Sequence, residues 1–185
     1  MISTNQFKTG MALVIDGELY ILIEFQHVKP GKGAAFVRTK LRSIKTGNVL
    51  QRTYDGGEKF QDAFIEKKQV QFLYRAGEEY HFMDLKSYDQ MVFRTGDLGD
   101  SADYLTENLE MRAELYEGKL VGLELPTTVI LKIADSDPGL KGDTSKSAMK
   151  LAVMETGLKL QVPLFVGPGD LLKVDTRTGE YAGRA

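Results

Sequence analysis

Apolar and polar residues alternate in short runs along most of the chain, and turn-forming residues separate the runs. Residues 11–25, MALVIDGELYILIEF, contain two such runs that meet at Asp16-Gly17, a dipeptide typical of a tight hairpin turn. Another turn is predicted at residues 45–48, and turn signals recur about every 8 to 12 residues, a spacing typical of all-β domains. The pattern therefore predicts an all-β protein.

The alternation is strictest in residues 34–44, AAFVRTKLRSI. Small or apolar residues at every second position predict a strand with one buried face, while its other face is solvated. We expect the solvated face to carry Phe36, Arg38, Lys40 and Arg42.

Three small barrels account for the predicted strands. Residues 10–54 have the pattern of a meander of four or five strands, the size of an SH3-like barrel. The remainder has the pattern of two further five-stranded barrels, and a shift in charge together with Pro126 suggests the boundaries. The predicted domains are residues 1–63, 64–127 and 128–185.

A helical segment is predicted only between Ser101 and Asn108. Ser101 and Asp103 are suitable N-caps there, and Tyr104, Leu105 and Leu109 would share one face.

The net charge of −2 is distributed unevenly. Residues 1–63 hold nine basic and six acidic residues, whereas residues 64–127 hold seven basic and thirteen acidic ones. Between Phe25 and Tyr54 there is no acidic residue. The basic residues of that segment are Lys29, Lys32, Arg38, Lys40, Arg42, Lys45 and Arg52. Such a local basic surface favours a polyanionic partner, although the solvated lysines of an ordinary hairpin give the same pattern.

Motifs for catalysis and metal binding are missing from the sequence. The chain has no cysteine, and PGKG at residues 30–33 is not a nucleotide-phosphate loop because a strand pattern follows it. Residues 135–146 resemble the start of a calcium loop but lack its final glutamate. Glu79, His81 and Asp84 do not suit a metal site, because successive residues of a strand point to opposite faces. We therefore expect no metal, no cofactor and no enzymatic activity.

Membrane insertion and secretion are not predicted either. No apolar run reaches the roughly 18 residues that a membrane span requires. The first ten residues, MISTNQFKTG, do not have the pattern of a secretory signal. We expect a cytoplasmic protein.

The stretch HVKPGKG, residues 27–33, places Lys32 between two glycines and just after a proline. Pro30 restricts φ, and Gly31 and Gly33 permit a tight turn, so Lys32 is predicted to be an exposed tip. Lysine is also a frequent target of covalent modification. From these residues alone, a soluble hairpin tip without further function fits equally.

Residues 27–42, HVKPGKGAAFVRTKLR, closely resemble the modified-residue loop of the bacterial elongation factor P family. Other motifs match the same family, and the resemblance covers essentially all 185 residues. They are GEKF at 57–60, QFLY at 71–74, FMD at 82–84, Tyr88, GDT at 142–144, METG at 154–157, VPLFV at 162–166 and VDTRTGEYAGRA at 174–185.

The resemblance implies an SH3-like (KOW-type) N-terminal domain followed by two OB-fold domains, in an L-shaped arrangement similar to tRNA. It implies a monomeric translation elongation factor that binds the 70S ribosome between the peptidyl-tRNA and exit-tRNA sites. Such a factor contacts peptidyl-tRNA and rRNA and stimulates peptide-bond formation at consecutive prolines, which relieves stalling.

The resemblance also assigns residues. Lys32 would be the lysine that a dedicated enzyme modifies and that extends toward the CCA end of the tRNA, in a loop shaped by Pro30, Gly31 and Gly33. The phosphate contacts to tRNA and rRNA would come from Lys29, Arg38, Lys40 and Arg42. The loop at the exit-site codon of the mRNA would consist of Gly142, Asp143 and Thr144, and the small-subunit contacts would come from Tyr181 and Arg184. A lysine at the tip is compatible with a β-lysyl extension, an aminopentanol-type extension or none, but not with the arginine rhamnosylation of some members.

One departure and two alternatives remain. Many members read K-P-A-T-[LM]-E-T-G where this chain has Leu151 and Val153, so we expect a local change at the start of that strand with function retained. A ribosome-binding paralogue, the elongation-factor-P-like protein, would share the architecture and differ in its stall motifs. A general single-stranded RNA-binding protein made of OB-folds is the other alternative, and the acidic middle domain disfavours it.

Overall fold

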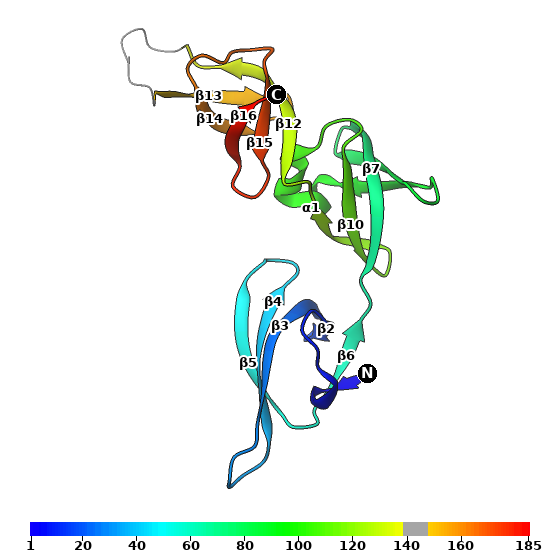
Figure 1. The fold of residues 1–185 in the computed structure, drawn as a ribbon. Helices are drawn as coiled ribbons and strands as arrows, with labels where there is room; N and C mark the ends of the chain where they lie inside the picture. Colours follow the sequence, from blue (N-terminus) through cyan, green and yellow to red (C-terminus); the bar gives the residue numbers. More distant parts are fainter. Residues whose placement is uncertain (139–147) are drawn as a thin grey trace. The chain divides into compact units, whose positions relative to one another are not determined.

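The computed structural model describes residues 1–138 and 148–185. The described residues form three antiparallel sheets joined by turns and short helical segments, which confirms the predicted all-β class (Figure 1). Two compact units divide the chain. One comprises Met1–Lys67 and Glu114–Gly122, and the other comprises Lys68–Ala113 and Leu123–Ala185. The predicted boundaries after residues 63 and 127 stay predictions.

The first sheet has six strands in the order β1-β6-β2-β3-β4-β5. Their bounds are β1 Ile2–Ser3, β2 Ala12–Ile15, β3 Glu18–Val28, β4 Phe36–Ser43, β5 Val49–Asp55 and β6 Lys59–Ala63, with the short 3-10 helix η1 at Thr4–Gln6. The predicted hairpin between β2 and β3 is confirmed. Asp16 and Gly17 have φ of +54° and +79°, the left-handed pair that a type I′ turn requires.

The core of this sheet is built from alternate residues of its strands. Leu13 of β2, Leu22 of β3 and Leu41 of β4 are fully buried and pack together with Phe7 and Phe60. Burial also alternates along β4, as predicted for residues 34–44, because successive side chains of a strand point to opposite faces. The opposite face of β4 is therefore left to the solvent.

The second sheet has five strands in the order β11-β10-β7-β8-β9. Their bounds are β7 Glu66–Ala76, β8 Glu79–Asp84, β9 Gln90–Arg94, β10 Glu110–Tyr116 and β11 Lys119–Glu124. Its aromatic core includes Phe72, Phe82 and Phe93, whose rings contact one another in sequence from β7 to β9.

The predicted helical segment at Ser101–Asn108 is displaced toward the N-terminus. Helix α1 spans Thr95–Leu98 and the 3-10 helix η2 spans Gly99–Tyr104. The helical backbone begins early because the Asp97 carboxylate accepts a hydrogen bond of 2.9 Å from the Arg94 N–H. It ends at Tyr104 because the next residue, Leu105, is extended and buried.

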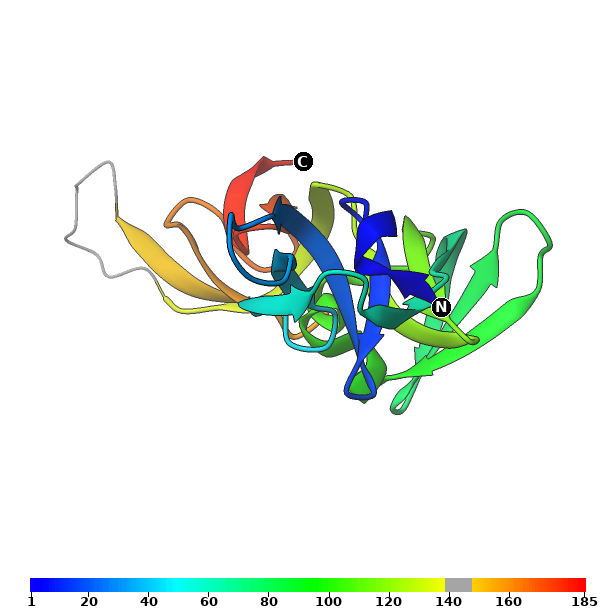
Figure 2. The same ribbon diagram turned by 90° about the horizontal axis from the view of Figure 1, so that it is seen from below.

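The third sheet has five strands in the order β14-β13-β12-β15-β16. Their bounds are β12 Thr128–Ser136, β13 Met149–Met154, β14 Lys159–Pro163, β15 Leu171–Asp175 and β16 Glu180–Arg184. Strands β12 and β13 lie side by side in both ribbon views (Figures 1 and 2). The edge strands β14 and β16 also contact each other, so this sheet curls back on itself as predicted for a small barrel. Leu131, Val162 and Leu172 are fully buried in its core.

A turn after β15 makes the stability of the third sheet depend on pH. Asp175 accepts hydrogen bonds from the Arg177 guanidinium, at 2.7 Å from Nη2, and from the Arg177 backbone N–H at 2.9 Å. These bonds lower the pKa of the Asp175 carboxyl from 3.8 to about 2. Because the folded-state pKa is depressed, the stabilisation is present above pH 3.8 and is lost as the pH falls toward about 2.

We therefore expect an Asp175→Asn variant to lose less stability than the parent protein over that acidic interval. The measurement is the free energy of unfolding by urea at a series of pH values. Parallel pH profiles for the two proteins would contradict a role for this carboxylate.

Candidate nucleic-acid interface

Lys32 lies on a seven-residue loop, residues 29–35, that connects β3 and β4. Figure 1 shows the β3–β4 hairpin projecting from the sheet, with this loop at its tip. All seven loop residues are exposed. Gly33 has φ of +111°, a backbone conformation that residues other than glycine rarely adopt, so the loop requires glycine at this position. The predicted exposed tip is thus present, and its shape depends on Gly33 more than on Gly31.

The loop begins where the hairpin pairing ends. Val28 of β3 pairs with Phe36 of β4, and this is the last pair of the β3–β4 ladder before the loop. In the part of the chain that the structure describes, the Lys32 ammonium has no carboxylate within ion-pair distance. Its charge is therefore available to a partner.

The predicted charged face of β4 is confirmed in its geometry, but its three cations differ. Arg38 and Arg42 are exposed, and the Arg38 guanidinium lies 5.6 Å from the centre of the Phe36 ring. Lys40 instead donates a hydrogen bond of 2.7 Å to Glu24 on β3. Its charge is thus partly neutralised, which distinguishes Lys40 from the two arginines.

A β-bulge accounts for this pairing. The register between β3 and β4 shifts between Leu22 and Glu24, so that Glu24 lies directly opposite Lys40. Sequence reasoning missed Glu24 as a partner of this face, because an extra residue in one strand cannot be counted from an alternation pattern.

A groove of about 330 Å³ lies on the same part of the sheet. Gln26 and Thr53 flank Arg38 on the two neighbouring strands, and Gln51 flanks Lys40. These neutral polar groups were not predicted, although the cross-strand positions follow once the register is known. They add hydrogen-bond donors and acceptors beside the cations, which suits phosphate and sugar groups.

Arg52 was counted with the basic segment but is engaged elsewhere. Its guanidinium donates a hydrogen bond of 2.9 Å to Asp16, and this bond raises the arginine's pKa. It also lies 5.9 Å from the centre of the Tyr20 ring. Arg52 therefore supports the hairpin turn of β2 and β3 and adds little to the free positive charge.

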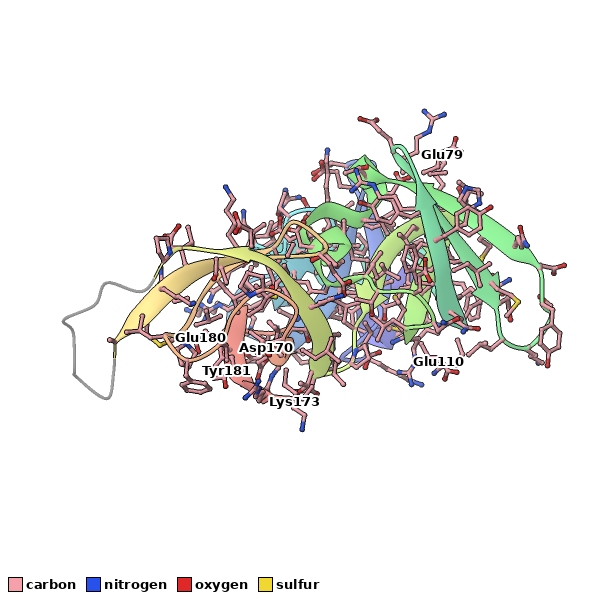
Figure 3. All side chains as sticks on the ribbon, turned by 90° about the horizontal axis from the view of Figure 1, so that it is seen from above. Glu79, Glu110, Asp170, Lys173, Glu180 and Tyr181 are labelled. Atoms are coloured by element: carbon pink, nitrogen blue, oxygen red, sulfur yellow. The ribbon has the colours of Figure 1, made fainter. Side chains whose placement is uncertain are left out.

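The other predicted site residues lie in the third sheet or outside the description. Gly142, Asp143 and Thr144 lie outside the described residues. Tyr181 of β16 is half-buried against the core of the third sheet (Figure 3). Arg184 donates a hydrogen bond of 2.9 Å to Asp170. Both have structural contacts within this sheet, and their predicted small-subunit contacts stay predictions.

Leu151 and Val153 lie within β13 and pair with Gln161 and Lys159 of β14. The segment thus continues as a regular strand where many family members carry a proline.

The rejected metal arrangement has the expected geometry. Glu79 and His81 share one face of β8, whereas Asp84 is buried on the other and accepts hydrogen bonds from the backbone N–H groups of Lys86 and Ser87. Within residues 1–138 and 148–185, no group of three or more acidic or histidine side chains is placed to hold a metal ion. Among these same residues, no helix is long and apolar enough to cross a membrane.

Three family models match the chain in succession. Residues 3–60 match the elongation factor P KOW-like domain, residues 65–123 match the elongation factor P OB domain, and residues 129–184 match the elongation factor P C-terminal domain.

Known proteins match over the whole length. The elongation factor P of Pelotomaculum thermopropionicum is 52% identical over 184 residues and that of Moorella thermoacetica is 48% identical over 185, with 100% of each chain covered. Among solved structures, the eukaryotic translation initiation factor 5A from Methanococcus jannaschii superposes with a TM-score of 0.54 at 20% identity, covering 67% of this chain and 91% of that one. This last match shows a shared fold. The three domain matches and the full-length identity confirm the resemblance: the chain belongs to the elongation factor P family of translation factors.

Proposed function

We propose that this protein binds the 70S ribosome between the peptidyl-tRNA and exit-tRNA sites and stimulates peptide-bond formation at consecutive prolines. The observation that carries the proposal is the exposed Lys32 at the tip of the β3–β4 hairpin, which has no ion pair among the described residues, in a chain of this family. The cytoplasm, where ribosomes work, is its proposed location.

Positioning explains how such a factor can act without catalytic groups. Proline is a constrained nucleophile, and a nascent chain of prolines leaves the peptidyl-tRNA poorly oriented. Holding reacting groups in the right geometry can lower a barrier by several kcal/mol, about 7 in favourable cases. A lysine on a narrow loop reaches into an RNA cleft that the barrel itself is too wide to enter. The proposed protein therefore orients the tRNA and leaves the chemistry to the ribosome.

The outward face of β4 supplies the proposed electrostatic contacts. Lys29, Arg38 and Arg42 are exposed on the hairpin that carries Lys32. Cations of this kind bind phosphates without regard to sequence, so they position the protein on tRNA and rRNA. Lys40 is the fourth proposed contact, and its bond to Glu24 must be exchanged or shared when RNA binds.

Covalent extension of Lys32 by a dedicated enzyme is part of the proposal. Its free ammonium is accessible, and the flanking glycines place no side chain beside it. The mass of the peptide that contains Lys32, from protein purified out of its own organism, tests this directly. An added mass on Lys32 is expected, and an unmodified lysine would mean that the bare ammonium suffices.

The remaining proposed contacts depend on the family alone. They are the exit-site codon contacts of Gly142, Asp143 and Thr144 and the small-subunit contacts of Tyr181 and Arg184. We also propose that the protein acts as a monomer.

A reconstituted translation reaction tests the function. We expect the protein to accelerate synthesis across three consecutive prolines, measured as the rate of full-length peptide formation, because only a poorly oriented substrate gains from positioning. A matched message with alanine codons in place of the prolines is the control, and its rate should not change. Equal acceleration of both messages, or of neither, would contradict the proposal.

A further inference from the structure

Thr4 is fully buried although it precedes the first long strand of the chain. Its hydroxyl accepts a hydrogen bond of 2.7 Å from the Gly57 N–H and donates one of 3.3 Å to the Asp55 carbonyl. Its own backbone N–H donates to the Glu58 carbonyl at 2.9 Å. One residue near the N-terminus thus holds three backbone groups of the turn between β5 and β6, more than fifty positions away.

The same turn is hydrogen-bonded to the end of the Lys32 loop. The Gly56 N–H donates a hydrogen bond of 2.8 Å to the carbonyl of Ala35, the last residue of the loop. This bond continues the β4–β5 ladder one step beyond the Phe36–Asp55 pair, toward Lys32. It therefore fixes the point at which the chain returns from the loop to the sheet.

Gly56 permits this bond because it has no side chain. A Cβ at this position would lie 2.9 Å from the Ala35 carbonyl oxygen and 3.1 Å from the Ala35 Cβ. Both are too close, and the first is a backbone atom that cannot move alone. Any larger residue at position 56 would thus displace the base of the loop.

We propose that Thr4, acting through the Gly56–Ala35 bond, is a positioning residue that sets the direction of the Lys32 loop. The inference rests on the proposed function, because it gives the loop direction a consequence in translation. Thr4 and Gly56 touch neither Lys32 nor the proposed phosphate contacts, so their effect would pass through the backbone. Without the hydrogen bonds of Thr4 to the β5–β6 turn, the loop would remain exposed but would sample more directions, and Lys32 would reach its target less often.

Replacement of Thr4 by valine removes the hydroxyl and keeps the shape of the side chain. We expect the rate of synthesis across three prolines at saturating factor to fall about tenfold, less than the roughly 100-fold that a 1 Å misplacement of a reacting group can cause. The half-saturating concentration should stay unchanged, because the basic face is intact. Thr4→Ser keeps the hydroxyl and should retain the parent rate. Gly56→Ala disturbs the Gly56–Ala35 bond directly and should lower the rate as Thr4→Val does.

Thr39 provides a matched control. Like Thr4, it is a buried threonine, but it lies in β4 and its hydroxyl donates a hydrogen bond of 2.9 Å to the Arg52 carbonyl, away from the base of the loop. Thr39→Val should lower the melting temperature by a similar amount and leave the saturating rate unchanged.

A cycle with Lys32→Ala separates positioning from general damage. In that background, Thr4→Val should have no further effect on the rate, because the group that it positions is gone. An equal loss in both backgrounds would overturn the inference, as would an unchanged rate for Thr4→Val beside an impaired Lys32→Ala. If Lys32→Ala itself is fully active, the proposed function of Lys32 fails first and the inference falls with it.

Amide hydrogen exchange tests the connection between Thr4 and the Gly56–Ala35 bond independently of any translation assay. Thr4→Val should raise the exchange rate of the Gly56 amide about tenfold, whereas Thr39→Val should not. Unchanged protection of Gly56 in the folded Thr4→Val protein would overturn the proposed connection.

Discussion

Replacement of Lys32 by alanine should abolish most of the acceleration at consecutive prolines, lowering the rate at saturating protein by about 100-fold or to the level without factor. Lys32 is the group at the tip of the hairpin, and its flanking residues, Gly31 and Gly33, offer no side chain to replace it. Rates of full-length peptide synthesis on a message with three prolines measure the effect.

Stability and binding should be nearly unaffected by this change. Lys32 is exposed and makes no ion pair within the described part of the chain, so its removal should alter the free energy of unfolding by less than about 0.5 kcal/mol. Lys32→Arg keeps a positive charge but replaces the compact ammonium by a planar guanidinium. We expect this variant to bind ribosomes normally and to rescue the rate only in part. Full activity of Lys32→Ala would refute the assignment of Lys32 as the working residue.

The features that could be predicted from the sequence are those that local residues determine. Asp16-Gly17 alone identifies the β2–β3 hairpin, because few other dipeptides adopt two positive φ angles. The alternation of β4 gives its buried and solvated faces, since the period of a strand is two. In the same way, Gly33 marks a turn that the structure shows to need φ of +111°.

The features that could not be predicted depend on register and on distant contacts. Lys40 belongs to a basic stretch in the sequence, but a bulge in β3 brings Glu24 to it. The buried hydroxyl of Thr4 has no local signal, because its partners Asp55 and Gly57 come from the other end of the domain. The helical backbone begins before the predicted segment because the Asp97 side chain, which accepts the hydrogen bond from the Arg94 N–H, precedes the residues that share an apolar face. The proposed function was inferred from the family resemblance, since the sequence contains no recognisable catalytic or metal-binding motif.

Loss of the two exposed arginines on β4 should weaken binding to the ribosome and make that binding less dependent on salt. Arg38 and Arg42 are exposed on one face, and each is expected to release about one counterion when it meets a phosphate. For Arg38→Ala combined with Arg42→Ala, we expect about a tenfold loss in affinity at moderate salt. The slope of log K against log salt should also be shallower by about two. Titration of labelled protein into ribosomes at several salt concentrations gives both values.

Two further variants test the charge on this face. Arg112 is a partly exposed arginine of β10, paired with Glu124 at 2.9 Å, and Arg112→Ala should leave the slope unchanged. Glu24→Gln frees the Lys40 ammonium from its 2.7 Å bond, so this variant should bind more tightly and with a steeper slope than the parent protein. Only Arg112→Ala separates this interface from a model based on net charge alone, because that model also predicts tighter binding for Glu24→Gln. Glu24→Gln and loss of an arginine must act in opposite directions, whereas Arg112→Ala, which changes net charge as much as either, must do nothing. A slope that follows net charge irrespective of position would show that the β4 face is not the contact surface.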